Sequence, residues 1–166
     1  MGIFITGLPG CGKSTLIQKI AERLNSEGIK VSGFVTPELR KDNKRVGFRI
    51  INLATNEEGV FASIKEMKES KKFGKYFVNI KEFEEIGLKG IENGEVIIID
   101  EIGKMELLSE KFRAILENLK NKKNLIASVH RSLANDFNAI DITNLSFSER
   151  EKLVNEIVEK VRKDLR

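Results

Sequence analysis

Short apolar runs alternate with amphipathic segments along the chain. Residues 3–5 form one such run, and apolar side chains then recur at helical spacing from Leu16 to Leu24. Gly28 is placed to end this helix, and residues 29–35 read as a second strand. The strand–helix–strand order predicts a βαβ unit and therefore a parallel sheet.

The next part of the chain has a different, β-rich pattern. Residues 36–38 are expected to leave the sheet, after which residues 46–53 and 60–64 form two β-like stretches separated by polar turns. We interpret them as an antiparallel meander inserted into the parallel sheet or added to its edge. Residues 65–75 are polar and charged, which is typical of a mobile loop or a solvated connector.

The second half returns to alternating strands and helices. Strands are predicted at residues 76–78, 96–101, 125–129 and 139–142. Helices are predicted from an Asn79 cap through Ile91 until Asn93-Gly94, from Ser109 to Leu119, and from a capping box at residues 148–151 to Leu165. The fold class is therefore α/β, with a mostly parallel central sheet and an added antiparallel β-meander.

A complete phosphate-binding loop joins the first strand to the first helix. Its G-x-x-x-x-G-K-[ST] pattern, with one further hydroxyl residue, comprises Gly7, Leu8, Pro9, Gly10, Cys11, Gly12, Lys13, Ser14 and Thr15. The glycines let backbone N–H groups turn inward at the positive end of a helix, which makes an anion site. We expect Lys13 to reach the β- and γ-phosphates of a nucleotide and the Ser14 hydroxyl to bind Mg²⁺, while Thr15 adds its hydroxyl or N–H.

Two acids follow a second informative apolar run. Residues 96–99 are all apolar and lead into Asp100 and Glu101, as in a Walker B strand buried on both faces. Ligands bind beyond the carboxyl ends of parallel strands, so these acids and the phosphate loop are expected to share one crevice. Asp100 would hold Mg²⁺ through a water, and Glu101 would orient or deprotonate an attacking water.

Basic residues add further candidates. The strand at residues 125–129 ends in His130 and Arg131, and either could stabilise a γ-phosphate if this strand lies beside the one ending at Asp100. Arg131 is kept as a candidate catalytic residue, with an ordinary surface arginine as the alternative. Arg150, in the first turn of the last helix, could contact phosphate or form an ion pair.

Length and composition limit the function classes. A chain of 166 residues suits one domain, residues 1–166. The net charge is +4, but both signs are mixed along the chain, so we expect no nucleic-acid partner. Cys11 is the only cysteine, which suits a reducing cytoplasm, and no apolar run has the length of a membrane span. We expect a cytoplasmic protein without a membrane partner, and a monomer is favoured.

Several stretches together resemble the THEP-type P-loop nucleoside-triphosphatases, whose vertebrate relatives are called cancer-related nucleoside-triphosphatases. The resemblance covers nearly the whole chain and is carried by residues 7–15, 33–40, 45–48, 74–76, 100–107 and 129–131. It implies a three-layer, RecA-like P-loop NTPase fold and Mg²⁺-dependent hydrolysis with loose base selectivity. By motif match the family's roles fall on Lys13, Ser14, Thr15, Asp100 and Glu101. The family often has an Asn-Arg pair where this chain has Glu149-Arg150.

The residues favour hydrolysis of nucleoside triphosphates over two other functions. We expect ATP, GTP, CTP and UTP as substrates and Mg²⁺ as the cofactor. A small-molecule or nucleotide kinase is the first alternative, but no arginine cluster suggests a lid that excludes water. A nucleotide-controlled interaction module is the second. The Asp100-Glu101 pair favours water as the attacking group.

Overall fold

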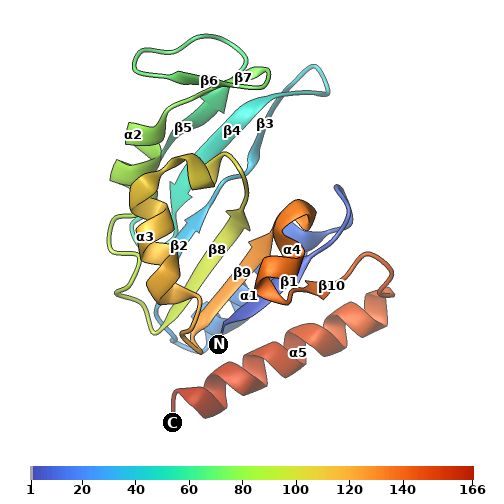
Figure 1. Cartoon of the computed structure of the whole chain (residues 1–166). Helices are drawn as coiled ribbons and strands as arrows, with labels where there is room; N and C mark the ends of the chain where they lie inside the picture. Colours follow the sequence, from blue (N-terminus) through green and yellow to red (C-terminus); the bar gives the residue numbers. More distant parts are fainter. Residues whose placement is uncertain (1) are drawn as a thin grey trace.

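The computed structural model describes residues 2–166 and contains one sheet with helices on both faces (Figure 1). The strands are β1 (Ile3–Thr6), β2 (Val31–Val35), β3 (Glu38–Lys41), β4 (Lys44–Asn52), β5 (Glu58–Ser63), β6 (Lys71–Phe73), β7 (Tyr76–Val78), β8 (Val96–Ile102), β9 (Leu125–Val129) and β10 (Ile140–Asp141). The helices are α1 (Lys13–Ser26), α2 (Ile80–Glu82), α3 (Glu110–Leu119), α4 (Ala134–Phe137) and α5 (Phe147–Asp164). Three short turns are a π-helical η1 (Phe83–Gly87) and two 3₁₀ turns, η2 (Glu106–Leu108) and η3 (Arg131–Leu133).

The sheet has a parallel half and an antiparallel half. Its strand order is β10-β1-β9-β8-β2-β4-β5-β7-β6, and β3 pairs with β4. Strands β10, β1, β9, β8 and β2 are parallel, whereas β4 and the strands beyond it are antiparallel. The meander therefore lies at the edge of the parallel strands, and the predicted α/β class with a mostly parallel centre is confirmed.

Two hydrophobic cores flank the sheet. Helices α1 and α5 cover one face through buried residues that include Ile20 and Val158. Helix α3 and η1 cover the opposite face through Phe112 and Phe83. Strand β8 contributes to both, since Val96 and Ile98 lie in the first core and Ile97 and Ile99 in the second. Its continuous apolar run is thus explained by burial on both faces.

Aromatic packing joins the meander to the parallel half. The ring centroid of Phe83 lies 5.0 Å from that of Phe34 on β2 and 4.8 Å from that of Phe61 on β5. The ring of Phe112 on α3 lies 5.4 Å from Phe34 and 5.6 Å from Phe83. All four rings are fully buried, so this cluster links β2, β5 and α3 across the edge of the parallel strands.

Two polar segments differ from their prediction. Residues 36 and 37 lie outside any strand as expected, but Glu38 already pairs with Phe48 in a β3–β4 hairpin. The predicted loop at residues 65–75 contains strand β6, which pairs with β7 across a tight turn where Gly74 has φ 59°. A strand in an exposed hairpin does not need alternating apolar and polar residues. The charged sequences of β3 and β6 therefore lack the pattern from which a strand is predicted.

Two helix boundaries were also predicted wrongly. Asn79 does cap a helix, since its Oδ1 accepts from Glu82 N at 2.9 Å, but η1 ends at Gly87, well before the predicted stop. The final capping box is formed by Ser146 and Glu149, with α5 beginning at Phe147. The pattern S-x-x-E occurs twice in overlapping registers, and the sequence does not distinguish them.

Among residues 2–166 no helix combines the length and the apolar character that crossing a bilayer requires.

We predict that Phe83→Ala lowers the free energy of unfolding by about 3–5 kcal/mol, because it leaves a cavity at the centre of the aromatic cluster. Urea denaturation measures the effect. Phe147→Ala is the matched control, since Phe147 is 73% exposed, and it should cost less than about 0.5 kcal/mol. Equal losses in the two variants would contradict a linking role for the cluster.

Candidate active site

The segments that carry the candidate residues follow or end strands β1, β8 and β9, at the carboxyl edge of the parallel strands (Figure 1). The phosphate loop follows β1, Asp100 and Glu101 lie at the end of β8, and His130 follows β9. Strand β9 lies between β1 and β8, as its pairings with both strands show. The parallel order thus brings together segments that are about ninety residues apart in sequence.

The phosphate loop depends on glycine at two kinds of position. Gly12, which directly precedes α1, has φ 96°, and Gly10 has φ 76°, a region that L side chains rarely adopt. At Gly7 the limit is space, because a Cβ there would lie 2.5 Å from Cys11 Sγ. The loop is also held from outside, since Leu8 N donates to Thr143 Oγ1 at 3.0 Å.

Arg150 holds the same loop from α5. Its guanidinium donates to three backbone carbonyls: to Leu145 O at 3.1 Å, to Ile142 O at 2.8 Å, and to Cys11 O inside the phosphate loop. The side chain therefore bonds to backbone carbonyls and not to a carboxylate, so the ion pair considered from the sequence is not formed. It joins the β10–α5 segment to the loop, so it is a positioning residue.

Lys13 and Glu101 form the direct contact between the two motifs. Lys13 Nζ lies 3.5 Å from Glu101 Oε2, and the side chains are only 14% and 29% exposed. Burial raises the pKa of Glu101, the nearby Asp100 charge raises it further, and Lys13 opposes both effects. A partly desolvated carboxylate beside a lysine is thus placed next to the phosphate loop.

Asp100 and Ser14 are the residues here that could hold a magnesium ion through oxygen atoms. Ser128 Oγ donates to Asp100 Oδ1 at 2.6 Å, which orients the carboxylate. Ser14 is the second residue of α1 and is exposed to solvent. Mg²⁺ is usually held by one or two protein oxygens together with substrate phosphates and water, and this donor set suits that chemistry.

Glu106 is a buried acid next to the site whose role the sequence did not reveal. It is only 4% exposed, and burial together with the Glu101 charge raises its pKa to about 8. Thr36 Oγ1 lies 3.1 Å from Glu106 Oε2 and 3.2 Å from the carbonyl oxygen of Asp100. A Cβ on Gly103 would lie 2.8 Å from Glu106 Oε1 and 3.3 Å from Glu101 Oε1, so both carboxylates border this glycine.

His130 and Arg131 are brought to the edge of the site. Their strand does lie beside β8, and His130 N donates to Ile102 O at 3.0 Å. Burial lowers the pKa of His130, and the charges of Lys13, Arg131 and Lys104 lower it further. Arg131 itself begins η3 as an exposed residue, so the structure places it near His130 at the rim of the site.

Arg45 is a further arginine on this side of the sheet, and the sequence did not suggest it for the site. Because β4 is antiparallel to β2 and Val35 at the end of β2 pairs with Ile51, the first residues of β4 extend beyond the carboxyl edge of the parallel strands. Arg45 Nε donates to Tyr76 Oη at 2.9 Å, and the charge of Arg45 lowers the pKa of Glu101. The strand register, rather than any local motif, would have been needed to find it.

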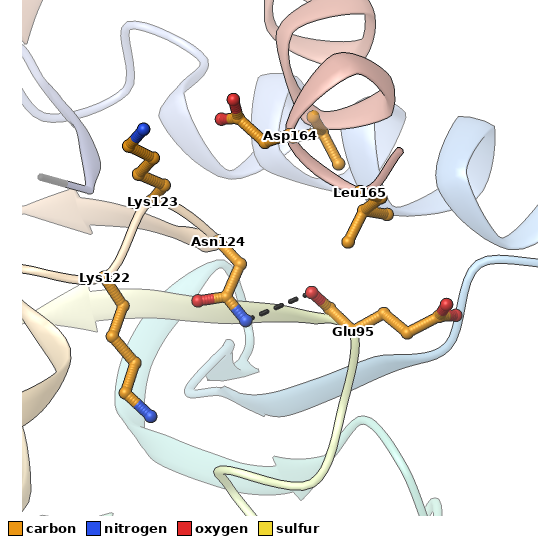
Figure 2. Close-up of a pocket in the computed structure, with 7 residues that line it drawn as sticks. Glu95, Lys122, Lys123, Asn124, Asp164 and Leu165 are labelled. Carbon is orange, nitrogen blue, oxygen red and sulfur yellow. Dashed lines mark hydrogen bonds between the residues drawn. The ribbon is translucent and has the colours of Figure 1, made fainter.

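A shallow hollow elsewhere has no connection with this site. Figure 2 shows it lined by Glu95, Lys122, Lys123, Asn124, Val161, Asp164 and Leu165. It lies where β8 and β9 begin, at the opposite end of the sheet from the phosphate loop. Its charged side chains spread toward solvent, and the hydrogen bond drawn there joins Asn124 Nδ2 to Glu95 O at 3.1 Å.

The fold and this site define a P-loop nucleotide-binding protein, and comparison with known proteins narrows the class. The profile of the family described as NTPase matches residues 2–158. The chain is 44% identical to nucleoside-triphosphatase THEP1 of Methanocaldococcus jannaschii, with 97% of each chain covered. It is 41% identical to nucleoside-triphosphatase THEP1 of Thermotoga maritima, with 95% of this chain and 94% of the relative covered.

Two solved structures support the same family assignment. The crystal structure of THEP1 from the hyperthermophile Aquifex aeolicus matches with a TM-score of 0.78 at 34% identity, covering 97% of this chain and 99% of that one. The solution structure of a human cancer-related nucleoside triphosphatase matches with a TM-score of 0.73 at 30% identity, covering 98% and 97%. The chain belongs to the THEP1 family of nucleoside-triphosphatases. The resemblance stated from the sequence is confirmed.

We predict that Glu106 gives the stability of the protein a specific pH dependence. Below about pH 4.5 the carboxyl carries its proton in both states; between 4.5 and about 8 the unfolded chain loses it while the folded chain keeps it. The free energy of unfolding should therefore fall by about 1.4 kcal/mol per pH unit from this group, and the loss is complete once the pH passes about 8.

Glu106→Gln imitates the protonated acid and should remove this part of the slope. Urea unfolding between about pH 5 and about pH 8 measures it. Glu117→Gln, at an exposed acid on α3, is the control and should keep the original slope. An unchanged slope in Glu106→Gln would show that the buried acid is already ionised.

We predict that Arg150→Ala loosens the phosphate loop, because three backbone carbonyls lose their donor. Amide hydrogen exchange of residues 7–13 should become faster, and the protein should lose about 1–3 kcal/mol of stability. Arg162→Ala, which removes an arginine paired with Glu27 at the far end of α5, is the control. Faster exchange in the control but not in Arg150→Ala would refute the positioning role.

Proposed function

We propose that the protein is a Mg²⁺-dependent nucleoside-triphosphatase that hydrolyses the terminal phosphate of ATP, GTP, CTP and UTP to give a nucleoside diphosphate and phosphate. The observation that carries the proposal is the 3.5 Å approach of Lys13 Nζ to Glu101 Oε2. It puts the phosphate-binding lysine and the candidate water-activating acid within one small volume. Membership of the THEP1 family supports the same activity.

Binding is attributed to the phosphate loop. The glycine-rich backbone and the start of α1 offer N–H groups and a positive helix end to the polyphosphate. Lys13 is paired with Glu101 in this structure, and its ammonium group leaves Glu101 to bind the β- and γ-phosphates when the nucleotide binds. Bound Mg²⁺ would shield the phosphate oxygens, with the Ser14 hydroxyl and the Asp100 carboxylate as its protein-side partners.

The chemical step is attributed to Glu101. Once Lys13 is drawn to phosphate, a Glu101 oxygen is free to accept a hydrogen bond from water and to align that water with the γ-phosphorus. The Ser128 contact to Asp100 and the Thr36 contacts to Glu106 and to the Asp100 carbonyl keep the end of β8 in place. Arg131 remains a candidate for stabilising developing charge from the rim.

Loose base selectivity follows from where these groups act. The loop, Lys13 and Glu101 all contact the phosphate chain, which every nucleoside triphosphate shares.

We place this activity in a reducing cytoplasm, because the one thiol, Cys11, lies within the phosphate loop.

We predict that two substitutions separate binding from hydrolysis. Lys13→Ala should weaken nucleotide binding and phosphate release together, because it removes the main charge on the phosphates. Glu101→Gln should keep nucleotide affinity within about threefold but lower kcat by about 10²–10⁴, since the amide cannot accept a proton from water. Phosphate release and calorimetric binding with Mg²⁺ and each of the four nucleotides measure both effects.

Glu117→Gln is the control for Glu101→Gln, because this exposed acid on α3 is distant from the site. Unchanged release in Glu101→Gln would remove this residue from the mechanism. Phosphate that appears on an added acceptor instead of in solution would show a kinase and overturn the proposed hydrolysis.

A further inference from the structure

The direction of the polyphosphate follows from the sheet order. Glu101 marks the γ-phosphate end, and it lies on β8, on one side of the strand that leads into the phosphate loop. In the order β10-β1-β9-β8, strand β1 has β9 and β8 on one side and β10 on the other. A bound nucleotide whose γ-phosphate points toward β8 therefore has its nucleoside on the side of β10 and the start of α5.

The segment on that side is attached to the phosphate loop. Thr143, between β10 and α5, accepts from Leu8 N at 3.0 Å, and Arg150 of α5 donates to Cys11 O. Helix α5 then runs beside α1 in the same direction, as the Lys19–Glu151 pair at 2.7 Å and the Arg162–Glu27 pair further along indicate. The first turn of α5 consequently lies beside the first turns of α1.

Phe147 is the first residue of α5 and is strongly exposed. It is 73% exposed, the largest value among the exposed large hydrophobic residues of the described chain. Lys19 Nζ lies 5.0 Å from the ring centroid, and Glu151 holds this ammonium at 2.7 Å. The cation occupies one face of the ring, and the exposure leaves the opposite face to solvent.

We propose that Phe147, with Lys19 behind it, is the platform on which the base of the bound nucleotide stacks. The inference rests on the proposed function and adds a base subsite to it. Every nucleobase has a π face, and stacking on an aromatic ring tolerates all of them, as loose base selectivity requires. Phe147 begins the helix that follows β10, and β10 lies on the side of β1 opposite β8, where a nucleoside emerges when its γ-phosphate faces Glu101.

The test compares ligands that do and do not carry a base. Phe147→Ala and Phe147→Leu should bind Mg²⁺–ATP about tenfold more weakly and bind Mg²⁺–tripolyphosphate as the original chain does. The leucine variant keeps an apolar side chain without a π face, so equal losses in both variants identify stacking as the cause. Leu165→Ala, at an exposed apolar residue at the far end of α5, should change neither affinity.

A second variant reports the contact directly. The chain contains no tryptophan, so Phe147→Trp introduces a single fluorophore at the platform. ATP should quench its fluorescence and tripolyphosphate should not. Equal loss of tripolyphosphate binding in Phe147→Ala, or unaltered tryptophan fluorescence on saturation with ATP, overturns the platform while the proposed hydrolysis stands. Failure of the original chain to bind either ligand would overturn both.

Discussion

The contact between Lys13 and Glu101 depends on the parallel order of three buried strands. Lys13 follows β1, and Glu101 lies near the end of β8. Lys13 Nζ and Glu101 Oε2 are 3.5 Å apart because β9 lies between these two strands and pairs with both. Strand β8 is fixed in turn by apolar residues that enter both cores. The packing of α1 and α5 on one face and α3 on the other thus determines the geometry at the carboxyl edge.

Backbone anchors complete this arrangement where the chain leaves the sheet. Arg150 and Thr143 fasten the phosphate loop from the β10–α5 segment, and Thr36 connects the end of β2 with the end of β8. The buried acid Glu106 borders the same glycine as Glu101. The loop and the acids are therefore each held by residues outside the two motifs, which is how a site is kept in position before its ligand arrives.

The residues that the sequence predicted and those that it missed differ in the range of their interactions. The phosphate loop and the apolar run before Asp100 are local patterns, and the carboxyl-edge rule then predicts that they meet. Glu106 looks like an ordinary acid in sequence, because its burial arises from segments 70 residues away, such as the one containing Thr36. Arg150 was named as a candidate, but its positioning role could not be predicted, since its partners are backbone carbonyls that no side-chain pattern marks.

The most direct test is a crystal structure with Mg²⁺ and a non-hydrolysable ATP analogue. We expect the γ-phosphate between Lys13 and Glu101, the metal beside Ser14 and Asp100, and a water hydrogen-bonded to Glu101 in line with the γ-phosphorus. An analogue bound in the phosphate loop with its γ-phosphate directed away from β8, so that no water joins it to Glu101, would contradict the account.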